Sequence, residues 1–142
     1  MSDSLWGDIE SLPTVNTPRV ILSEQAGHLT NSTKGLLVGE IQSYAMDEHS
    51  NETEITFDIY ARSLNNYRVR ILDCRFGKYY YPATVYIEDD NTWQEVADES
   101  AFKKLLAEIL KSARVRNIVG GLLSELRSMG FEPKDEKEDI PF

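Results

Sequence analysis

The feature that most constrains the fold is a change in the spacing of hydrophobic residues along the chain. Between residues 35 and 89, four runs rich in β-branched and aromatic residues alternate apolar and polar positions: GLLVGEIQSYAM, TEITFDIYARS, YRVRILDCR and YYYPATVYIED. Alternation with a period of two is typical of strands with one buried face. Because only short polar segments (DEHSNE, LNN and FGK) separate the runs, the sequence predicts a four-stranded antiparallel β-meander.

A helix is predicted before the meander. In the segment TPRVILSEQAGHLTNST, Thr17 suits an N-cap and Pro18 suits the first helical position, where a missing N–H does no harm. We therefore expect a helix from residue 18 to about 31.

Two helical segments are predicted after the meander. Apolar residues recur at helical spacing from Phe102 to Leu110, with Asp98 or Ser100 as the cap. The same spacing continues over residues 115–129, a second segment that Ser112 opens. Gly130 suits its C-terminal cap, and Gly120 with Gly121 suggests a kink or a close helix contact. The predicted fold class is thus α+β, with the C-terminal helices packed on the sheet.

The alternation also predicts which side chains face the core. The expected core positions of the last three strands are Ile55, Phe57, Ile59, Tyr67, Val69, Ile71, Tyr79, Tyr81, Ala83, Val85 and Ile87. The expected opposite face carries Glu54, Thr56, Asp58, Tyr60, Arg68, Arg70, Tyr80, Thr84 and Tyr86.

That opposite face suggests a nucleic-acid interface. Tyr60, Tyr80 and Tyr86 could stack bases, while Arg68 and Arg70 could follow the phosphates of a single strand. In an alternative interpretation, the two arginines pair with acidic residues of the neighbouring strand, Glu54 and Asp58. In a third, the first helix covers part of the face and some of the tyrosines belong to the core.

Length and composition indicate one folded domain with a tail. The chain has 142 residues, of which 41% are hydrophobic and 27% charged, and a net charge of −9. We expect one domain over residues 1–130 and a flexible acidic tail over residues 131–142. A single cysteine, with no signal-peptide pattern and no apolar run of spanning length, favours a cytoplasmic protein. Homo-oligomerisation stays open.

The tail ends in DIPF behind several acidic residues, and this ending resembles the C-terminal tip of bacterial single-stranded-DNA-binding proteins. In that family the tip docks onto replication, recombination and repair enzymes. The terminal phenylalanine enters an apolar pocket, its carboxylate meets a basic residue, and nearby acids meet a basic rim. The resemblance implies these partner-binding residues: Asp135, Glu136, Glu138, Asp139, Ile140, Pro141 and Phe142.

The resemblance covers the tip alone. Lys134 and Lys137 dilute the acidic run, and the long low-complexity linker of that family is missing. The predicted body also differs from that family's oligonucleotide-binding barrel, because a helix precedes the strands and helices follow them. The tail could also fold back onto the basic helices of its own chain.

Catalysis has little support in the sequence. No nucleotide-binding loop, zinc pattern or nucleophile motif occurs, so we predict no catalytic residue, no metal and no cofactor. His28 and His49 have no evident orienting partner, and we expect Cys74 to be a small buried side chain. A run of three strand-end acids could hold a divalent cation, as in a nuclease: Glu88, Asp89 and Asp90.

The sequence therefore predicts a non-enzymatic accessory protein of bacterial DNA metabolism. It would bind replication and repair proteins through its tail, and the sheet face offers a site for single-stranded DNA. One alternative is a protein-sequestering module, similar in kind to an immunity or inhibitor protein, that covers a basic partner with the acidic stretches 47–58 and 88–99. A small metal-dependent nuclease is the second alternative.

Overall fold

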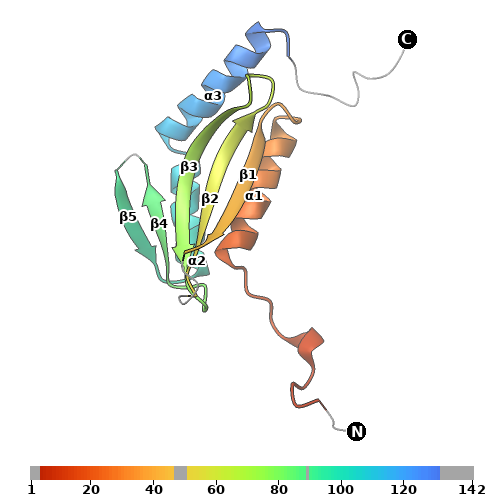
Figure 1. Cartoon of the computed structure of the whole chain (residues 1–142), viewed down its shortest axis with the longest axis vertical. Helices are drawn as coiled ribbons and strands as arrows, with labels where there is room; N and C mark the ends of the chain where they lie inside the picture. Colours follow the sequence, from red (N-terminus) through yellow and green to blue (C-terminus); the bar gives the residue numbers. More distant parts are fainter. Residues whose placement is uncertain (1–3, 47–50, 89, 132–142) are drawn as a thin grey trace, which may run out of the picture.

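A curved antiparallel sheet with helices against one of its faces forms the body of the protein (Figure 1). The structure is a computed structural model that describes residues 4–46, 51–88 and 90–131. After a short 3-10 turn, η1 (Ile9–Ser11), the elements are α1 (Pro18–Ser32), β1 (Val38–Ala45), β2 (Thr53–Ala61), β3 (Tyr67–Phe76), β4 (Ala83–Ile87), β5 (Thr92–Val96), α2 (Glu99–Leu110) and α3 (Ala113–Ser128). Each strand pairs with the next in sequence order. The predicted α+β class and the antiparallel meander are confirmed.

The sheet has five strands, so the predicted number of four was wrong. The extra strand, β5, follows β4 in a hairpin and forms an edge of the sheet. Four of its five residues are exposed and only Val96 is buried. A strand with so little buried surface carries no clear alternation, which is why the sequence pattern does not show it.

The strand β4 begins at Ala83, later than its sequence pattern predicts. Residues 77–82 form a turn in which Tyr80 adopts a positive φ of 71°. Tyr79 in this turn is 76% exposed, so its predicted place in the core was wrong. Tyr67, at the first position of β3, is 50% exposed and also lies outside the core.

The core lies between the sheet and the helices. Most predicted strand positions are confirmed, since Ile55, Phe57 and Ile59 of β2 and Val85 of β4 are nearly inaccessible to solvent. The helices contribute these buried apolar side chains: Ile21, Leu22, Ala26, Phe102, Leu105, Leu106, Ile109, Val115, Leu122 and Leu126.

A β-bulge in β3 changes which face the later side chains of that strand occupy. Phe57 pairs with Leu72 and Asp58 pairs with Arg70, so Ile71 is an extra residue without a partner in β2. Side chains after the bulge therefore lie on the opposite face from the one that unbroken alternation predicts.

Capping residues set the helix ends as predicted. Thr17, Asp98 and Ser112 each accept a hydrogen bond from the backbone N–H three residues later. This resolves the choice between Asp98 and Ser100, and it separates α2 from α3. Gly130 follows α3 with a φ of 89°, a left-handed conformation that glycine adopts at little cost.

Glycine lets α1 lie directly on β1. A Cβ atom at Gly39 would stand 2.5 Å from Cα of Ala26, closer than van der Waals contact allows. By contrast, Cβ atoms at Gly120 and Gly121 would meet nothing within 4 Å, so the predicted close helix contact at these two residues was wrong.

Cys74 is completely buried, as predicted, and desolvation raises the pKa of its thiol to about 12. The thiol therefore stays protonated at neutral pH. Within the described ranges, no helix has both the length and the apolar character needed to cross a bilayer.

Candidate functional site: the charged face of the sheet

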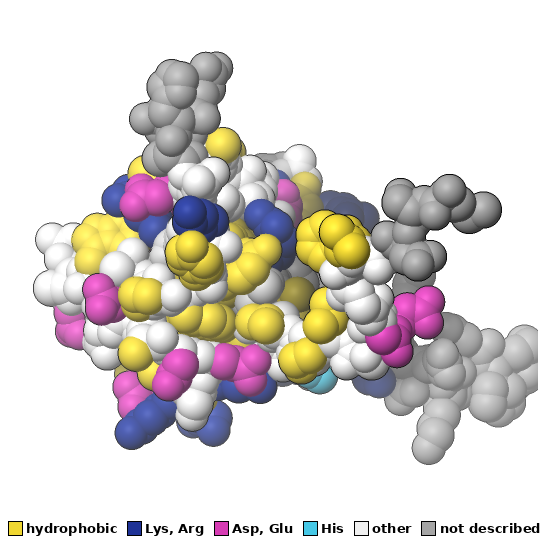
Figure 2. All heavy atoms as spheres, turned by 90° about the horizontal axis from the view of Figure 1, so that it is seen from below, with side chains coloured by type: hydrophobic (Ala, Val, Ile, Leu, Met, Phe, Trp, Pro, Cys, Tyr) yellow, Lys and Arg dark blue, Asp and Glu magenta, His cyan; other side chains and the backbone are white. Residues whose placement is uncertain are grey.

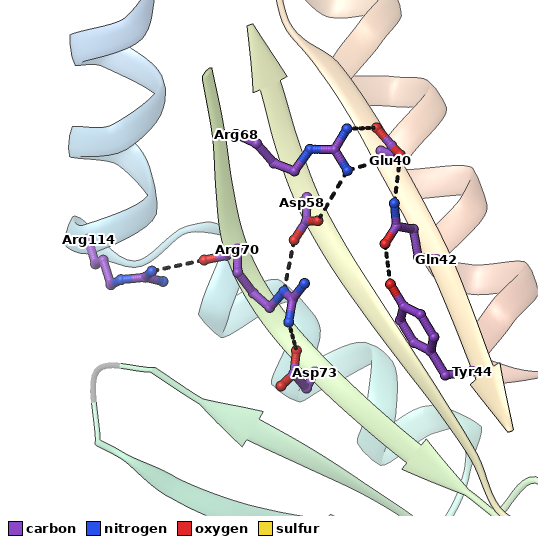
Figure 3. Close-up of polar contacts among 8 residues, drawn as sticks. All are labelled: Glu40, Gln42, Tyr44, Asp58, Arg68, Arg70, Asp73 and Arg114. Carbon is purple, nitrogen blue, oxygen red and sulfur yellow. Dashed lines mark hydrogen bonds and ion pairs between the residues drawn. The ribbon is translucent and has the colours of Figure 1, made fainter. Parts of the chain in front are cut away.

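The face of the sheet opposite the helices carries a group of interacting charged side chains (Figure 3). They come from β1, β2 and β3, and we call them the charged cluster: Glu40, Asp58, Arg68, Arg70 and Asp73.

Strand register brings the charged cluster together. Glu40 in β1 lies across from Asp58 in β2, and Asp58 lies across from Arg70 in β3. Arg68 is two residues before Arg70 and so shares its face. Asp73 joins them because of the bulge, since unbroken alternation would turn this carboxylate towards the helices.

Asp58 is buried beneath two arginines. Its exposed fraction is 1%, although it lies on the face opposite the helices. The Nε atom of Arg70 donates a hydrogen bond to Oδ1 at 3.0 Å, and Nη1 of Arg68 lies 3.9 Å from Oδ2. Because a buried carboxylate is costly without cationic partners, these two guanidinium groups make the position tolerable.

The charged cluster continues across β1. Arg68 meets Glu40 through both of its terminal nitrogens, at 3.0 and 3.1 Å. Gln42 donates to Glu40 at 3.0 Å, and the hydroxyl of Tyr44 donates to Gln42. On the other side, Nη2 of Arg114 donates to a backbone carbonyl of β3 at 3.0 Å, which ties the start of α3 to the sheet.

Two members of the charged cluster have shifted pKa values. The hydrogen bond with Asp58 raises the pKa of Arg70. Burial raises the pKa of Asp73, and the nearby Arg70, 3.6 Å away, offsets this in part. The ionised form of Asp73 is therefore less favourable in the fold than in the unfolded chain.

We expect Asp73→Asn to raise the free energy of unfolding at about pH 7, with a gain that shrinks on acidification. The pKa of Asp73 is higher in the folded protein, so the fold binds this proton more tightly than the unfolded chain does. The resulting stabilisation is fully present below the unfolded pKa and is lost as the pH rises through the folded pKa. Asparagine remains neutral throughout. Urea unfolding of both proteins between about pH 4 and 7 measures the difference, and a gain that grows on acidification would contradict the argument.

A second group of side chains lies towards β5. The guanidinium of Arg75 stands 4.3 Å from the ring centroid of Trp93, and this ring lies 5.3 Å from that of Tyr86. Arg75 also faces Glu54 at 3.9 Å. This arginine, like those of the charged cluster, already has an acidic neighbour.

The structure brings together some of the predicted nucleic-acid contacts. Tyr60, Arg68 and Arg70 are neighbours, with the guanidinium of Arg68 5.0 Å from the Tyr60 ring centroid. Tyr86 lies further along the sheet, in β4. Tyr80 lies in the turn before β4 and not on a strand face, so its predicted placement was wrong.

The alternative pairing of arginines with acids of the neighbouring strand is confirmed for Arg70 with Asp58. Arg68 pairs most closely with Glu40 of β1, and the partner of Glu54 is Arg75. The hypothesis that the acidic stretch 47–58 covers a basic partner protein loses support in β2, because Asp58 is buried and Glu54 already pairs with Arg75.

Several residues of this face were not predicted to lie there, among them Glu40, Asp73, Arg75 and Trp93. Glu40 lies in a predicted strand, where strand order could have suggested its proximity to β2. The positions of Asp73 and Arg75 depend on the bulge, which has no clear sequence signature. Trp93 belongs to the strand that was not predicted.

The structure gives less support to the other predicted sites, or does not describe their residues. Glu88 and Asp90 line a hollow of about 220 Å³ together with Glu108 and Arg114. Among the described residues no three histidine, cysteine or acidic side chains converge on a metal position. Asp89 and His49 lie outside the described residues, as does the whole predicted partner-binding set from Asp135 to Phe142.

Comparisons with known proteins found no protein similar to this chain. No protein-family model matches the chain, and neither the curated proteins nor the solved structures include a match to it.

Proposed function

We propose that this protein is a non-enzymatic accessory protein of bacterial DNA metabolism whose acidic tail binds replication and repair proteins. The observation that carries the proposal is the ending DIPF behind Asp135, Glu136 and Glu138. The ring of Phe142 supplies an apolar anchor, and the carboxylate beside it supplies a negative charge. Pro141 reduces the entropy that docking must overcome. The proposal requires Phe142 to carry the terminal carboxylate.

The end of α3 supports a division between body and tail. The backbone N–H of Gly130 donates to Arg127 at 3.0 Å, and that of Phe131 donates to Leu126 at 2.9 Å. This pattern, with glycine in a left-handed conformation, is the Schellman motif that terminates helices. The acidic segment thus follows a capped helix end.

Single-stranded DNA binding by the sheet face is a second candidate function. Two cation–aromatic pairs favour it, Arg68 with Tyr60 and Arg75 with Trp93, because bases could stack beside a guanidinium there. The carboxylates that already neutralise these arginines oppose it, since a phosphate would have to replace them. We therefore rank this activity below tail-mediated binding. Binding of an oligonucleotide that weakens with salt and with Tyr60→Ala would support it.

A titration tests the tail. We expect a labelled peptide ending EKEDIPF to bind a bacterial repair enzyme that reads such tips, measured by fluorescence anisotropy. The same peptide without Phe142 should bind at least about tenfold more weakly, because burial of one phenylalanine ring contributes roughly 2 kcal/mol.

The full-length protein supplies the matched controls. Phe142→Ala should weaken binding, and one added residue after Phe142 should do the same by moving the carboxylate. Equal binding by the wild type and both variants would contradict the proposal. A peptide that binds while the full chain does not would indicate that the tail is held by its own body.

A further inference from the structure

The N-terminal segment over residues 4–16, which we call the arm, exposes large apolar side chains. Every residue from 4 to 15 is exposed, and Leu5 and Trp6 reach 99% and 78%. Ile9 and Leu12 are more than half exposed. In Figure 1 the arm extends beyond the body from the start of α1. Figure 2 views the body from this end and shows hydrophobic side chains gathered there, with charged ones around them.

The spacing of these side chains is that of an amphipathic helix. Leu5, Trp6, Ile9 and Leu12 would form one stripe, with Asp8 and Glu10 on its two flanks. The structure has one short helical turn in the arm, η1, and no buried residue in it. A helix this short is marginal in water unless its apolar stripe packs against something. In this structure the apolar stripe of the arm therefore packs against no other part of the described chain, although its sequence is suited to such packing.

Such a surface exists between α1 and the C-terminal helices. Two adjoining hollows of about 450 and 230 Å³ share Gln25 and Leu110 in their walls, and we call them together the helix groove. The first has Ile21 and Leu106 among its lining residues. The second reaches Phe57 and Ile59 of the sheet and has Leu29, Val115 and Val119 at its sides.

The helix groove is long enough for the arm, and the side of the groove formed by α2 carries positive charge. Along α1 it runs from Ile21 to Ser32, roughly 18 Å at the rise of an α-helix, and a helix over residues 5–12 would be roughly 12 Å long. Lys103 and Lys111 of α2 line the groove together with Glu24 of α1, so an acidic flank of the arm fits against α2 and not against α1.

The connection between arm and body directs the arm outwards. Leu12 and Thr17, which precede prolines, are extended with ψ of 140° and 162°. The hydroxyl of Tyr81 donates to the carbonyl of Asn16 at 2.8 Å, and its ring lies 6.3 Å from that of Phe102. These contacts fix the end of the arm next to α1. The arm could enter the groove of its own chain only if the extended segment between Leu12 and Thr17 reversed its direction.

We propose that residues 5–12 fold into a helix in the helix groove of a second copy of this chain, with the two copies exchanging arms. Reciprocal exchange gives a closed two-fold dimer, because each copy offers the same arm and the same groove. Docking places the apolar stripe over the walls of the groove and supplies the packing that lets the arm helix form.

Sedimentation equilibrium of the full-length chain tests the exchange. We expect a wild-type dimer, and we expect Leu5→Ala/Trp6→Ala to raise its dissociation constant at least about tenfold. Ala107→Arg should do the same by filling the groove. Ala107 is exposed on α2 and arginine suits helices, so this variant should fold. Lys104→Ala, at an exposed position of α2 that lines neither hollow, is the matched control and should remain a dimer.

Two further experiments, mixing the arm variant with the groove variant and measuring Trp6 fluorescence, test whether the dimer forms by exchange of arms. The arm variant retains a groove and the groove variant retains an arm, so a mixture of the two should form heterodimers. Emission from Trp6, followed in a Trp93→Phe background, should shift to shorter wavelength with dimer formation. A monomeric wild type, or a dimer insensitive to both variants, would overturn the proposal. So would a monomer whose Trp6 emission changes with Ala107→Arg, because the arm would then occupy its own groove.

Discussion

Gly39→Ala is expected to lower the free energy of unfolding by about 3 kcal/mol, at the upper end of the range for overpacked cores. The added Cβ would stand 2.5 Å from Cα, 2.7 Å from Cβ and 2.8 Å from the carbonyl oxygen of Ala26. Two of these three atoms belong to the backbone of α1, which cannot move aside as a flexible side chain can. The helix would have to lift from β1, exposing the buried side chains Ile21 and Leu22. Urea unfolding followed by circular dichroism measures the change.

Gly27→Ala is the matched control. Gly27 lies within α1, and a Cβ atom there would meet nothing within 4 Å. Alanine should therefore raise the free energy of unfolding by up to about 1 kcal/mol through its higher helix propensity. Equal stability of Gly39→Ala and the wild type would mean that α1 is not seated on β1 as described.

Arg70→Ala is expected to cost about 2 kcal/mol of folding free energy. It would leave the buried carboxylate of Asp58 with Arg68, 3.9 Å away, as its remaining cationic partner. Breaking a buried ion pair typically costs more, but the Arg70 side chain is 43% exposed, so water can reach the site once it is removed. Chemical denaturation of the variant gives the value.

Two further variants distinguish a buried charge from lost packing. Arg68→Ala keeps the hydrogen bond between Arg70 and Asp58 and should cost less, about 1 kcal/mol. Asp58→Asn combined with Arg70→Ala should recover much of the stability, because no charge is then left buried. A double variant as unstable as the sum of its single changes would refute the electrostatic explanation.

Local chemistry explains the features that were predicted well. The caps Thr17, Asp98 and Ser112 could be predicted because each accepts a hydrogen bond from a backbone N–H only three residues later in the chain. The core positions Ile55, Phe57 and Ile59 of β2 follow from the strict alternation of apolar and polar residues in its sequence, although Thr56 and Asp58 on the other face are buried too. These properties depend on neighbours in sequence, so one sequence is enough to read them.

The errors arose where turn geometry and backbone pairing, and not the alternation of side chains, decide the structure. Tyrosine is common in strands, yet the turn over residues 77–82 leaves the side chain of Tyr79 exposed to solvent. The strand β5 is held by its pairing with β4 and buries little besides Val96. Backbone pairing of this kind does not depend strongly on side-chain type, so it leaves a weak trace in the sequence.

The sequence by itself determined the α+β class, the antiparallel order of the predicted strands, the helix caps and the DIPF ending on which the proposed function rests. The tertiary structure alone decided how the charges combine. One extra residue in β3 turns Asp73 to the face of Arg70, and strand register then places Arg68 beside Glu40. Ion pairs form between side chains that are close in space, and that proximity depends on register and bulges, which no local pattern encodes.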